Sequence, residues 1–454
     1  LIVSNTYVIA TSHTLAVGSA SRDQVDNLLN GNGGLVPVGS FEYFGPDQVL
    51  RDESTGEFNE HGNDSWAYDQ RGFDFVSRDQ IGYNDGIHYP IFRTKNRGKF
   101  QRLILKPAAN DNYSFENGAH IRDAYVHALS QVGDLHLDER SYEPCVLYLN
   151  GQYWGVYEIR EKVDDSDFTK HYYDQNENNC YFLQTWGGTW SAYGGAAAQT
   201  DWDNLQNYIM TNNMADPTAW AYVDSKYNWQ SLADYVILNG YVVCMDWLNW
   251  NTAWWHGLNP AGDGLRWRYT LWDDDATFGH YVNYTGIPNT TPSADPCDPE
   301  SLGDPGGQGH VPILNKLMAE SPIFKQYYIN RYIDLSNTVF QCDNMVPFLD
   351  SLIANIDAEM AAQCTLWGGT YAGWQGTVTT LRNYILARCA NQQAGQGMVD
   401  CYDLSGPYAV TFDVDPPLSG QIQINSVTPT DYPFIGTYFG GIVTDLQAIS
   451  APGW

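Results

Sequence analysis

Three consecutive aspartates, Asp273 to Asp275, are the part of the sequence best suited to chemistry. They lie in the segment WDDDATFG, residues 272–279, after the β-type run RWRYTLW, residues 266–272. Side chains alternate faces along an extended chain, so we expect Asp273 and Asp275 to project together while Asp274 points away. Two carboxylates on one face suit Mg²⁺, which takes one or two carboxylates beside phosphate oxygens. A solvated acidic turn is the alternative interpretation.

Asp246 and Asn251 form a second candidate pair, which follows the apolar run 235–245. The same spacing occurs in protein-kinase catalytic loops, where the aspartate accepts the proton of the substrate hydroxyl and the asparagine binds a metal ion. This spacing alone is common by chance. The order of parts adds weight, because an Asp/Asn loop, a strand and an aspartate before Phe-Gly follow one another in a kinase large lobe. Phosphoryl transfer needs mainly positioning and charge neutralisation, so one base and a few metal ligands suffice.

Two other segments could contribute to a phosphate site. The turn at 61–65 (HGNDS), followed by Arg71, could bring backbone N–H groups close to phosphate oxygens. Glu158, Arg160, Glu161 and Lys162 stand where a predicted hairpin ends. An ordinary turn and a solvated strand edge are the alternatives for these two segments.

Periodicity and turn signals predict the elements that position these residues. Apolar runs at 145–149 and 153–159 flank Asn150-Gly151, a strong hairpin signal. Helical spacing predicts helices over 121–131 and 229–241. The chain therefore begins with β-rich sequence and becomes helical after about residue 165, which predicts an α+β fold.

The remaining segments complete this outline. Residues 1–100 favour short strands with one helix after Ser21, and residues 313–390 favour three helices. The Gly-, Pro- and Asn-rich segment 281–311 is expected to be a functional loop or a disordered insert. Residues 408–450 return to alternating strands.

Composition excludes several classes of protein. Hydrophobic residues make up 43% of the 454 residues, enough for a large core and too many for wholesale disorder. The net charge of −30 and the lack of a basic stripe argue against nucleic-acid partners. No apolar run approaches the roughly 18 residues of a membrane span. Many Tyr, Trp and Gly with few Lys suggest a secreted protein, and a salt-adapted acidic surface is the alternative.

The eight cysteines are too scattered for a disulfide scaffold, and no CxxC pair supports a cysteine zinc site. One or two bridges could form late in the chain, among Cys342, Cys364, Cys389 and Cys401. Reduced core thiols are an equal alternative. Both ends of the sequence resemble cuts from a longer polypeptide, so targeting information is expected outside it.

Taken together, these segments resemble the spore-coat CotH family of atypical secreted protein kinases. The hairpin and its exit (CVLYLNGQYWGVYEIREKVD) resemble one family block, and FQRLILKPAAND with HIRD, within residues 100–123, resembles another. WDDDATFG is similar to the family motif Trp-Asp-x-Asp-x-x-Phe-Gly, and the helical run 310–388 has the layout of the family's C-terminal helices. The resemblance covers roughly residues 35–395 and suggests a bacterial multidomain secreted member.

The resemblance implies a two-lobed, atypical protein-kinase-like fold with ATP and Mg²⁺ as cofactors and a Ser/Thr-bearing protein as acceptor. Asp246 would be the catalytic carboxylate, Asn251 and Asp273 would bind the metal with Asp275 behind them, and Glu161 would help to hold the nucleotide. The expected divisions are an N-terminal extension (1–34), a β-rich N-lobe (35–163), a mainly helical C-lobe (164–400) and a small, truncated β segment (401–454). The location would be extracellular or at the cell surface.

One departure from the family pattern leaves other functions open. The early family block resembles His-Gly-x-x-Ser-Arg-x-x-Pro-Gln-Lys, but this chain has Trp66 in place of the Arg and Arg71 in place of the Lys, which is a natural phosphate anchor. Arginine keeps the charge as a wider planar donor, so the replacement is not conservative. An inactive pseudokinase, or a structural or adhesion module, is therefore one alternative. A glycan-binding or glycoside-hydrolysing protein is another, suggested by 16 Trp, 32 Tyr and many carboxylates.

Overall fold

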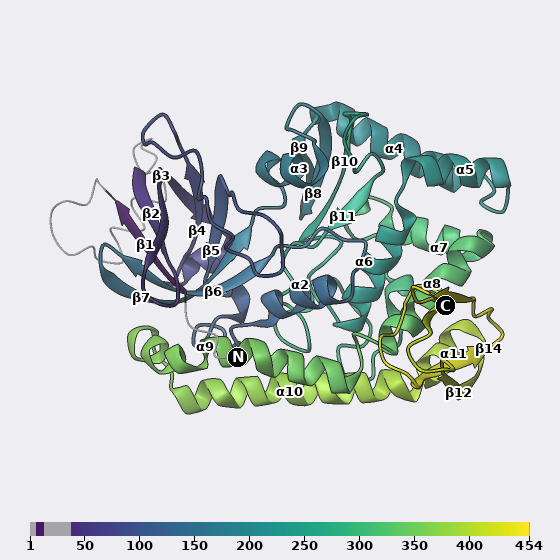
Figure 1. Ribbon diagram of the computed structural model, residues 1–454. Coiled ribbons are helices and arrows are strands. Elements are labelled where there is room, and N and C mark those ends of the chain that lie inside the picture. Colours follow the sequence, from purple (N-terminus) through teal and green to yellow (C-terminus); the bar gives the residue numbers. More distant parts are fainter. Residues whose placement is uncertain (1–5, 13–37, 454) are drawn as a thin grey trace.

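A closed barrel of strands forms one side of the molecule (Figure 1). The computed structural model describes residues 6–12 and 38–453, so the helix expected after Ser21 lies outside the described residues. The strand order is β1-β2-β3-β4-β5-β7-β6, with neighbours antiparallel except where β1 closes the barrel parallel to β6. The strands are β1 Thr6–Ser12, β2 Val38–Phe44, β3 Leu50–His61, β4 Gly72–Ser77, β5 Arg102–Lys106, β6 Tyr142–Leu149 and β7 Gln152–Glu161.

The predicted hairpin is confirmed as β6–β7. Asn150 and Gly151 both have positive φ, 50° and 76°, as a two-residue type I′ turn requires. Glu158, Arg160 and Glu161 at its end are at most 2% exposed, so a solvated edge is the wrong interpretation of these charges. They are buried because α2 (Arg122–Val132) and β5 cover them, and they pair with other charges.

A second, four-stranded sheet lies beside the barrel, with the order β11-β10-β8-β9. Its strands are β8 Cys180–Trp186, β9 Gly188–Tyr193, β10 Thr252–Gly257 and β11 Arg268–Thr270. The strand predicted over 266–272 is therefore shorter, because the chain leaves the sheet after Thr270. The nearby helices are α3 Ser166–Tyr173, α4 Gly195–Thr211, α5 Pro217–Lys226 and α6 Trp229–Tyr241.

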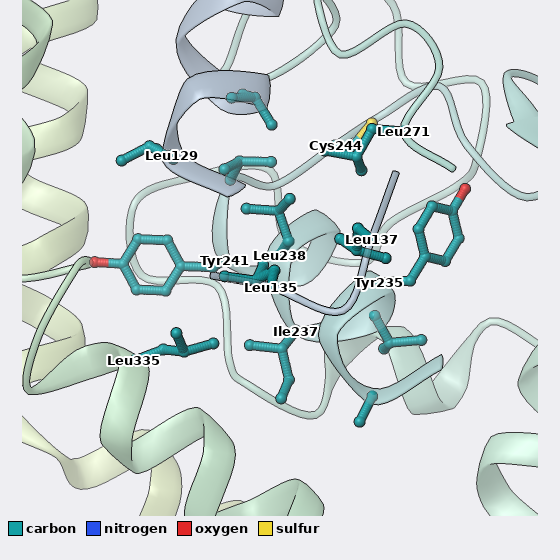
Figure 2. Close-up of a cluster of buried hydrophobic side chains, with 14 of the residues drawn as sticks. Leu129, Leu135, Leu137, Tyr235, Ile237, Leu238, Tyr241, Cys244, Leu271 and Leu335 are labelled. Carbon is teal, nitrogen blue, oxygen red and sulfur yellow. The ribbon is translucent and has the colours of Figure 1, made fainter. Parts of the chain in front are cut away.

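Helix α6 matches the helix predicted over 229–241. The side chain of Asn228 accepts a hydrogen bond from the Ser231 N–H and caps its start. The predicted apolar face of Leu232, Tyr235 and Leu238 is buried. The rest of the helix is buried as well, because α8 (Pro322–Ser336) and β11 pack against it. Leu129, Leu135 and Leu137 also lie beside it (Figure 2). It forms the centre of the main core, next to the loop that carries Asp246.

The C-terminal part of the family-like region contains four long helices where three were expected. They are α7 His310–Glu320, α8 Pro322–Ser336, α9 Cys342–Trp367 and α10 Tyr371–Ala394, followed by the short α11 Gln396–Tyr402. Ser321 caps α8 and Pro322 occupies its first turn, so one non-helical residue separates α7 from α8. So short a break leaves no gap in the periodicity. Helices α9 and α10 pack against each other along one edge (Figure 1).

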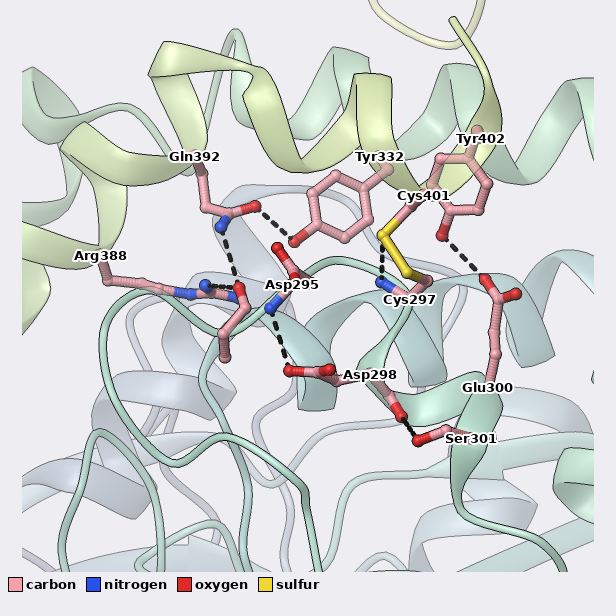
Figure 3. The surroundings of a disulfide bond; sticks show 11 residues. Asp295, Cys297, Asp298, Glu300, Ser301, Tyr332, Arg388, Gln392, Cys401 and Tyr402 are labelled. Carbon is pink, nitrogen blue, oxygen red and sulfur yellow. Dashed lines mark hydrogen bonds between the residues drawn. A yellow bond between two sulfur atoms is a disulfide. The ribbon is translucent and has the colours of Figure 1, made fainter.

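The segment 281–311 is an ordered loop that contains two short 3₁₀ helices, η4 Asp298–Ser301 and η5 Pro305–Gly307. Cys297 forms a disulfide with Cys401 of α11, and Tyr402 donates a hydrogen bond to Glu300 (Figure 3). A second disulfide joins Cys342 and Cys389, which were both among the predicted candidates. Cys364 is instead a buried free thiol. The segment is thus anchored to the helices, which excludes the disordered alternative.

Residues after α11 form two small antiparallel ribbons, β12–β14 and β13–β15, as the alternating pattern predicts. Their strands are β12 Ser405–Phe412, β13 Gly420–Ile424, β14 Phe434–Gly440 and β15 Leu446–Ser450. The ribbons contact α8, where Asp334 accepts hydrogen bonds from Ser426. The fold is therefore mixed α+β. Across the part of the chain that the structure describes, no helix has the length and apolar character needed to cross a membrane.

Candidate active site

A cavity of about 600 Å³ lies between the barrel and the second sheet. Three of the predicted site residues, Asp246, Asn251 and Asp273, line it. Arg71, Glu161 and Asp275, the other three, are not among its lining residues. The cavity walls come from β3, β4 and β5, from the β8–β9 hairpin, and from the segments around residues 162–164, 246–252 and 272–273.

Asp246 and Asn251 are held together in the loop between α6 and β10. The Asn251 amide donates to Oδ2 of Asp246 at 2.9 Å and to its main-chain carbonyl at 3.2 Å. Val243, Leu248 and Asn251 all have positive φ, between 45° and 67°. Such backbone is costly for residues other than glycine and persists only where its surroundings enforce it. The loop conformation thus aims one carboxylate at the cavity.

Contacts on both sides of Asp246 enforce that conformation. The Met245 N–H donates to the carbonyl of Ala276, just beyond the three aspartates, at 2.9 Å. Thr285, in the 281–311 segment, accepts a hydrogen bond from the Trp247 N–H at 2.8 Å and donates its own N–H to Met245. The Asp246 loop is therefore tied both to the aspartate segment and to the long loop that the disulfide anchors.

Lys106, the last residue of β5, connects Asp273 to a buried ion-pair network. Its Nζ lies 2.6 Å from Oδ1 of Asp273 and 2.8 Å from Oδ2 of Asp123. Burial alone would lower the pKa of Lys106, but the Asp123 and Asp273 carboxylates outweigh it and raise the pKa. Arg160 pairs with the same oxygen of Asp123 at 2.7 Å. Lys106 therefore stays charged and holds Asp273 at the cavity wall.

The two neighbouring aspartates take different directions from Asp273. Asp274 points away, as predicted, and its Oδ2 lies 3.3 Å from Nε2 of His127. Asp275 is buried, and its Oδ2 accepts a hydrogen bond from the Asn110 N–H at 2.9 Å. Burial, with repulsion from Asp273, raises the pKa of Asp275 well above its ordinary value. Asp273 and Asp275 were expected to project from the same face. Only Asp273 lines the cavity.

Asp123, His127 and Asp274 form a buried cluster whose ligand-type atoms lie within 4.8 Å of one another. Nδ1 of His127 accepts a hydrogen bond from the Arg140 N–H, so a neutral His127 carries its proton on Nε2, facing the carboxylates. Burial lowers the pKa of His127 to about 3, which keeps the ring neutral. A protonated Nε2 cannot bind a metal, and the cluster is better explained as a brace between α2 and the aspartate segment.

The remaining candidates serve as supports. Nε of Arg71 donates to the carbonyl of Trp66 at 2.7 Å, and its guanidinium stacks on that ring. The turn that begins at His61 does line the cavity. Glu161 is buried against Arg97 and also accepts a hydrogen bond from Tyr172. Neither Arg71 nor Glu161 reaches the cavity directly.

The sequence patterns do not predict the buried partner of Asp273, Lys106, or the Asp123 carboxylate that shares this lysine. A usable signal exists for Lys106, because it directly follows Leu103, Ile104 and Leu105, which are all fully buried. A lysine that continues such a strand must be buried with a counter-charge or turn out to solvent.

Residues 59–391 match the protein-family model described as CotH kinase protein. The chain belongs to this family. The match begins near the end of β3 and ends within α10, so it contains the whole cavity, and β12–β15 lie beyond it. No curated protein matches the chain. Membership of the CotH kinase family indicates a kinase-like function, with use of a nucleotide and a divalent metal.

The cavity fits both a nucleotide and a divalent metal ion. The cavity volume is in the range of about 300–1,000 Å³ that small-molecule sites occupy. Asp246, Asn251 and Asp273 present the oxygen donors that Mg²⁺ prefers. Lys106 supplies a fixed positive charge for phosphate oxygens at the same wall. An apolar residue at 106 would leave Asp273 without this partner.

Proposed function

We propose that this protein transfers the γ-phosphoryl group of ATP to Ser or Thr hydroxyls of extracytoplasmic proteins, in a Mg²⁺-dependent reaction. The observation that carries the proposal is the lining of one cavity by Asp246, Asn251, Asp273 and Lys106, which come from three separate stretches of chain. Kinase chemistry needs a base, metal-binding oxygens and a fixed cation, and this cavity supplies each of them.

Asp246 acts as the base. Its carboxylate accepts the proton of the acceptor hydroxyl while the hydroxyl oxygen forms a bond to the γ-phosphorus, and the bond from that phosphorus to the β-phosphate oxygen breaks to release ADP. The amide of Asn251 orients Asp246 through its 2.9 Å hydrogen bond. Bound Mg²⁺ would neutralise phosphate charge, held by Asp273 and Asn251 with Asp275 behind them.

Lys106 takes the role of phosphate anchor in this scheme. The family-like anchor position is occupied by Arg71, whose side chain contacts Trp66. Arg71 and Glu161 therefore support the turn and the barrel, and neither binds the nucleotide directly. The departure at Trp66 and Arg71 then does not abolish activity, which separates this proposal from a pseudokinase.

The test is transfer of radiolabel from ATP to the protein itself and to a generic Ser/Thr-rich acceptor. Wild type should label the acceptor only with a divalent metal present, and Asp246→Asn should not. A pseudokinase would instead show a thermal shift with ATP and Mg²⁺ and no transfer in either protein. Equal labelling by wild type and Asp246→Asn would remove Asp246 from the mechanism.

A glycan-binding or glycoside-hydrolysing function is the second candidate. Trp186 and Trp190, 44% and 47% exposed, line the same cavity and could stack against sugar rings. Hydrolysis would require two carboxylates flanking the scissile bond, and Asp246, Asp273 and Glu60 are among those that line the cavity. Release of reducing sugar from a polysaccharide panel would favour this function over phosphoryl transfer.

An extracellular location is part of the proposal. The Cys297–Cys401 and Cys342–Cys389 disulfides are consistent with an oxidising compartment, where such bonds persist.

A further inference from the structure

Arg140 differs from the other buried cations of the molecule. Among the residues that the structure describes, seven Lys or Arg residues are buried. Six of them have carboxylate or main-chain carbonyl partners for their side chains: Arg97, Lys106, Arg122, Arg160, Arg331 and Arg388. Arg140 is 3% exposed, and within the described ranges its guanidinium has neither an ion pair nor a hydrogen bond.

The Arg140 side chain is nevertheless held firmly and belongs to the cavity wall. Its guanidinium carbon lies 4.4 Å from the centroid of the Trp272 ring. Its main-chain N–H donates to Nδ1 of His127 at 2.9 Å. Both Arg140 and Trp272 line the cavity, and Trp272 directly precedes Asp273. A planar cation is therefore fixed beside the proposed metal ligand with its donors unused.

The charges of the lining are mixed: four cations stand with the five carboxylates of Glu60, Asp74, Asp164, Asp246 and Asp273. Lys106, Arg102 and Lys162 line the same cavity. Burial lowers the pKa of His61 well below its ordinary value, and these three cations and Arg140 lower it further. Three of the five carboxylates already pair with a cation of the lining: Asp74 with Arg102 at 2.7 Å, Asp164 with Lys162 at 3.2 Å and Asp273 with Lys106 at 2.6 Å. Arg140 is the lining cation that has no such pair among the described residues.

An unpaired buried charge is costly, so a protein retains one where a bound group supplies its partner. We infer that Arg140 binds the phosphate chain of the nucleotide and that Trp272 fixes the guanidinium for this contact. Arginine is suited to the task because its planar donors match phosphate oxygens in pairs. The inference rests on the proposed function in one respect: it takes the bound phosphate compound to be the nucleotide that donates the phosphoryl group.

The experiment compares Arg140→Met with Arg97→Met, a closely matched control. Arg97 is also 3% exposed and stacks on an aromatic ring, Phe100, at 4.5 Å. It differs in having Glu161 and Asp167 as partners and in lying outside the cavity lining. Thermal unfolding and calorimetric binding are measured for both variants and wild type with inorganic tripolyphosphate, with ATP and with adenosine.

Without ligand, Arg140→Met should have an unchanged or higher Tm, because it removes an unpaired buried charge. Arg97→Met should have a lower Tm, because it leaves Glu161 unpaired. Tripolyphosphate and ATP should bind Arg140→Met about 10- to 100-fold more weakly than wild type, as expected for loss of a charge-assisted hydrogen bond. Arg97→Met should bind both as wild type does, and any adenosine binding should be equal in all three proteins.

Three results would overturn the inference: no tripolyphosphate binding to wild type, equal tripolyphosphate binding to wild type and Arg140→Met, or a fall in the Tm of Arg140→Met as large as that of Arg97→Met. Loss of tripolyphosphate binding in Arg140→Met without any phosphate transfer by wild type would support the phosphate site and contradict the kinase proposal. The two claims can therefore fail separately.

Discussion

The two walls of the cavity are built in opposite ways. The barrel wall is charged and most of its charges are paired: Lys106 with Asp273, Arg102 with Asp74 and Lys162 with Asp164. The wall from the second sheet and its loops carries exposed aromatic rings, and Asp246 is the one charged residue that the described segments 184–190, 246–252 and 284 contribute to the lining. Buried ion pairs fix positions, whereas exposed rings adapt to different partners. The contrast suggests that the charged wall holds the phosphate donor and the aromatic wall receives the acceptor.

The largest effect should come from Asp246→Asn, which removes the base from the aromatic wall. We expect phosphate transfer to fall about 10²- to 10⁴-fold, since a positioned base contributes this much to proton transfer. The thermal shift with ATP and Mg²⁺ should remain, because the charged wall is unchanged. Initial rates of radiolabel transfer and a thermal-shift series measure the two effects.

Asp203→Asn is a suitable control for that comparison. Asp203 lies on α4, is exposed and accepts a hydrogen bond from Gln199, so its loss should affect neither readout. Loss of the nucleotide shift in Asp246→Asn would mean that the two walls do not divide the work as proposed.

Lys106→Met should produce the next largest effect, now on the charged wall. It leaves Asp273 without its lysine, and breaking a buried pair typically costs about 3–5 kcal/mol. We expect a loss near the lower end, about 3 kcal/mol, because Arg160 still pairs with Asp123. Urea unfolding measures the stability, and calorimetry should show weaker nucleotide binding.

The matched surface change is Lys316→Met. Lys316 pairs with Glu320 one turn along α7, where both side chains are partly exposed, and such pairs contribute little to stability. A Lys106→Met protein as stable as Lys316→Met would show that the buried network does not fix the charged wall.

These contrasting walls were only partly predictable from the sequence. The β6–β7 hairpin and α6 were predictable because local signals decide them, namely Asn150-Gly151 and the apolar period after Asn228. The five-residue separation of Asp246 and Asn251 predicted the Asp246 loop. Which residues form the charged wall was not predictable. The ion pair of Lys106 with Asp123 and the lack of such a pair for Arg140 depend on segments that meet only in the folded chain.

The aspartate segment shows where a local rule reaches its limit. Alternation of side chains correctly predicted that Asp274 points away from Asp273. It did not place Asp275, because the strand ends at Thr270 and the side chain turns to the Asn110 N–H. The three aspartates thus lie in irregular backbone that tertiary hydrogen bonds determine.

Replacing the exposed rings tests the aromatic wall with a smaller effect. Trp186→Ala and Trp190→Ala should each raise the KM for a protein acceptor by about tenfold, near the lower end of what loss of a large interface ring costs. The KM for ATP should not change, because the charged wall is intact. Tyr408→Ala, an exposed ring on β12, is the control and should alter neither constant.

Equal increases in both KM values would contradict the division between the walls. If a polysaccharide protects the Trp186 and Trp190 rings from fluorescence quenching and a protein acceptor does not, the second candidate function gains support.

The smallest effect concerns what lies behind each wall. Behind the aromatic wall, His310 is buried between Trp202 and Trp254, and Nδ1 lies 2.8 Å from the hydroxyl of Tyr269. Burial lowers the pKa of His310 to about 3, whereas an unfolded histidine has a pKa near 6.5. Between these values the unfolded chain binds a proton that the folded protein does not, so stability falls as the pH drops from 6.5 towards 3.

In His310→Phe, unfolding should no longer take up a proton at position 310. The slope of unfolding free energy against pH should become shallower by up to about 1.4 kcal/mol per pH unit, although the missing acceptor for Tyr269 lowers stability at pH 7. Urea unfolding at pH 7.0, 6.0 and 5.0 measures the slope.

Behind the charged wall, Asp123 should not contribute over this range, because Arg160 and Lys106 overcome the effect of burial and hold its pKa well below its ordinary value. His127, whose pKa burial lowers to about 3, should contribute in the same direction as His310, and Glu158, whose pKa burial raises, should act in the opposite direction. Equal slopes for wild type and His310→Phe would assign the acid sensitivity to other buried groups, of which His127 behind the charged wall is the first candidate.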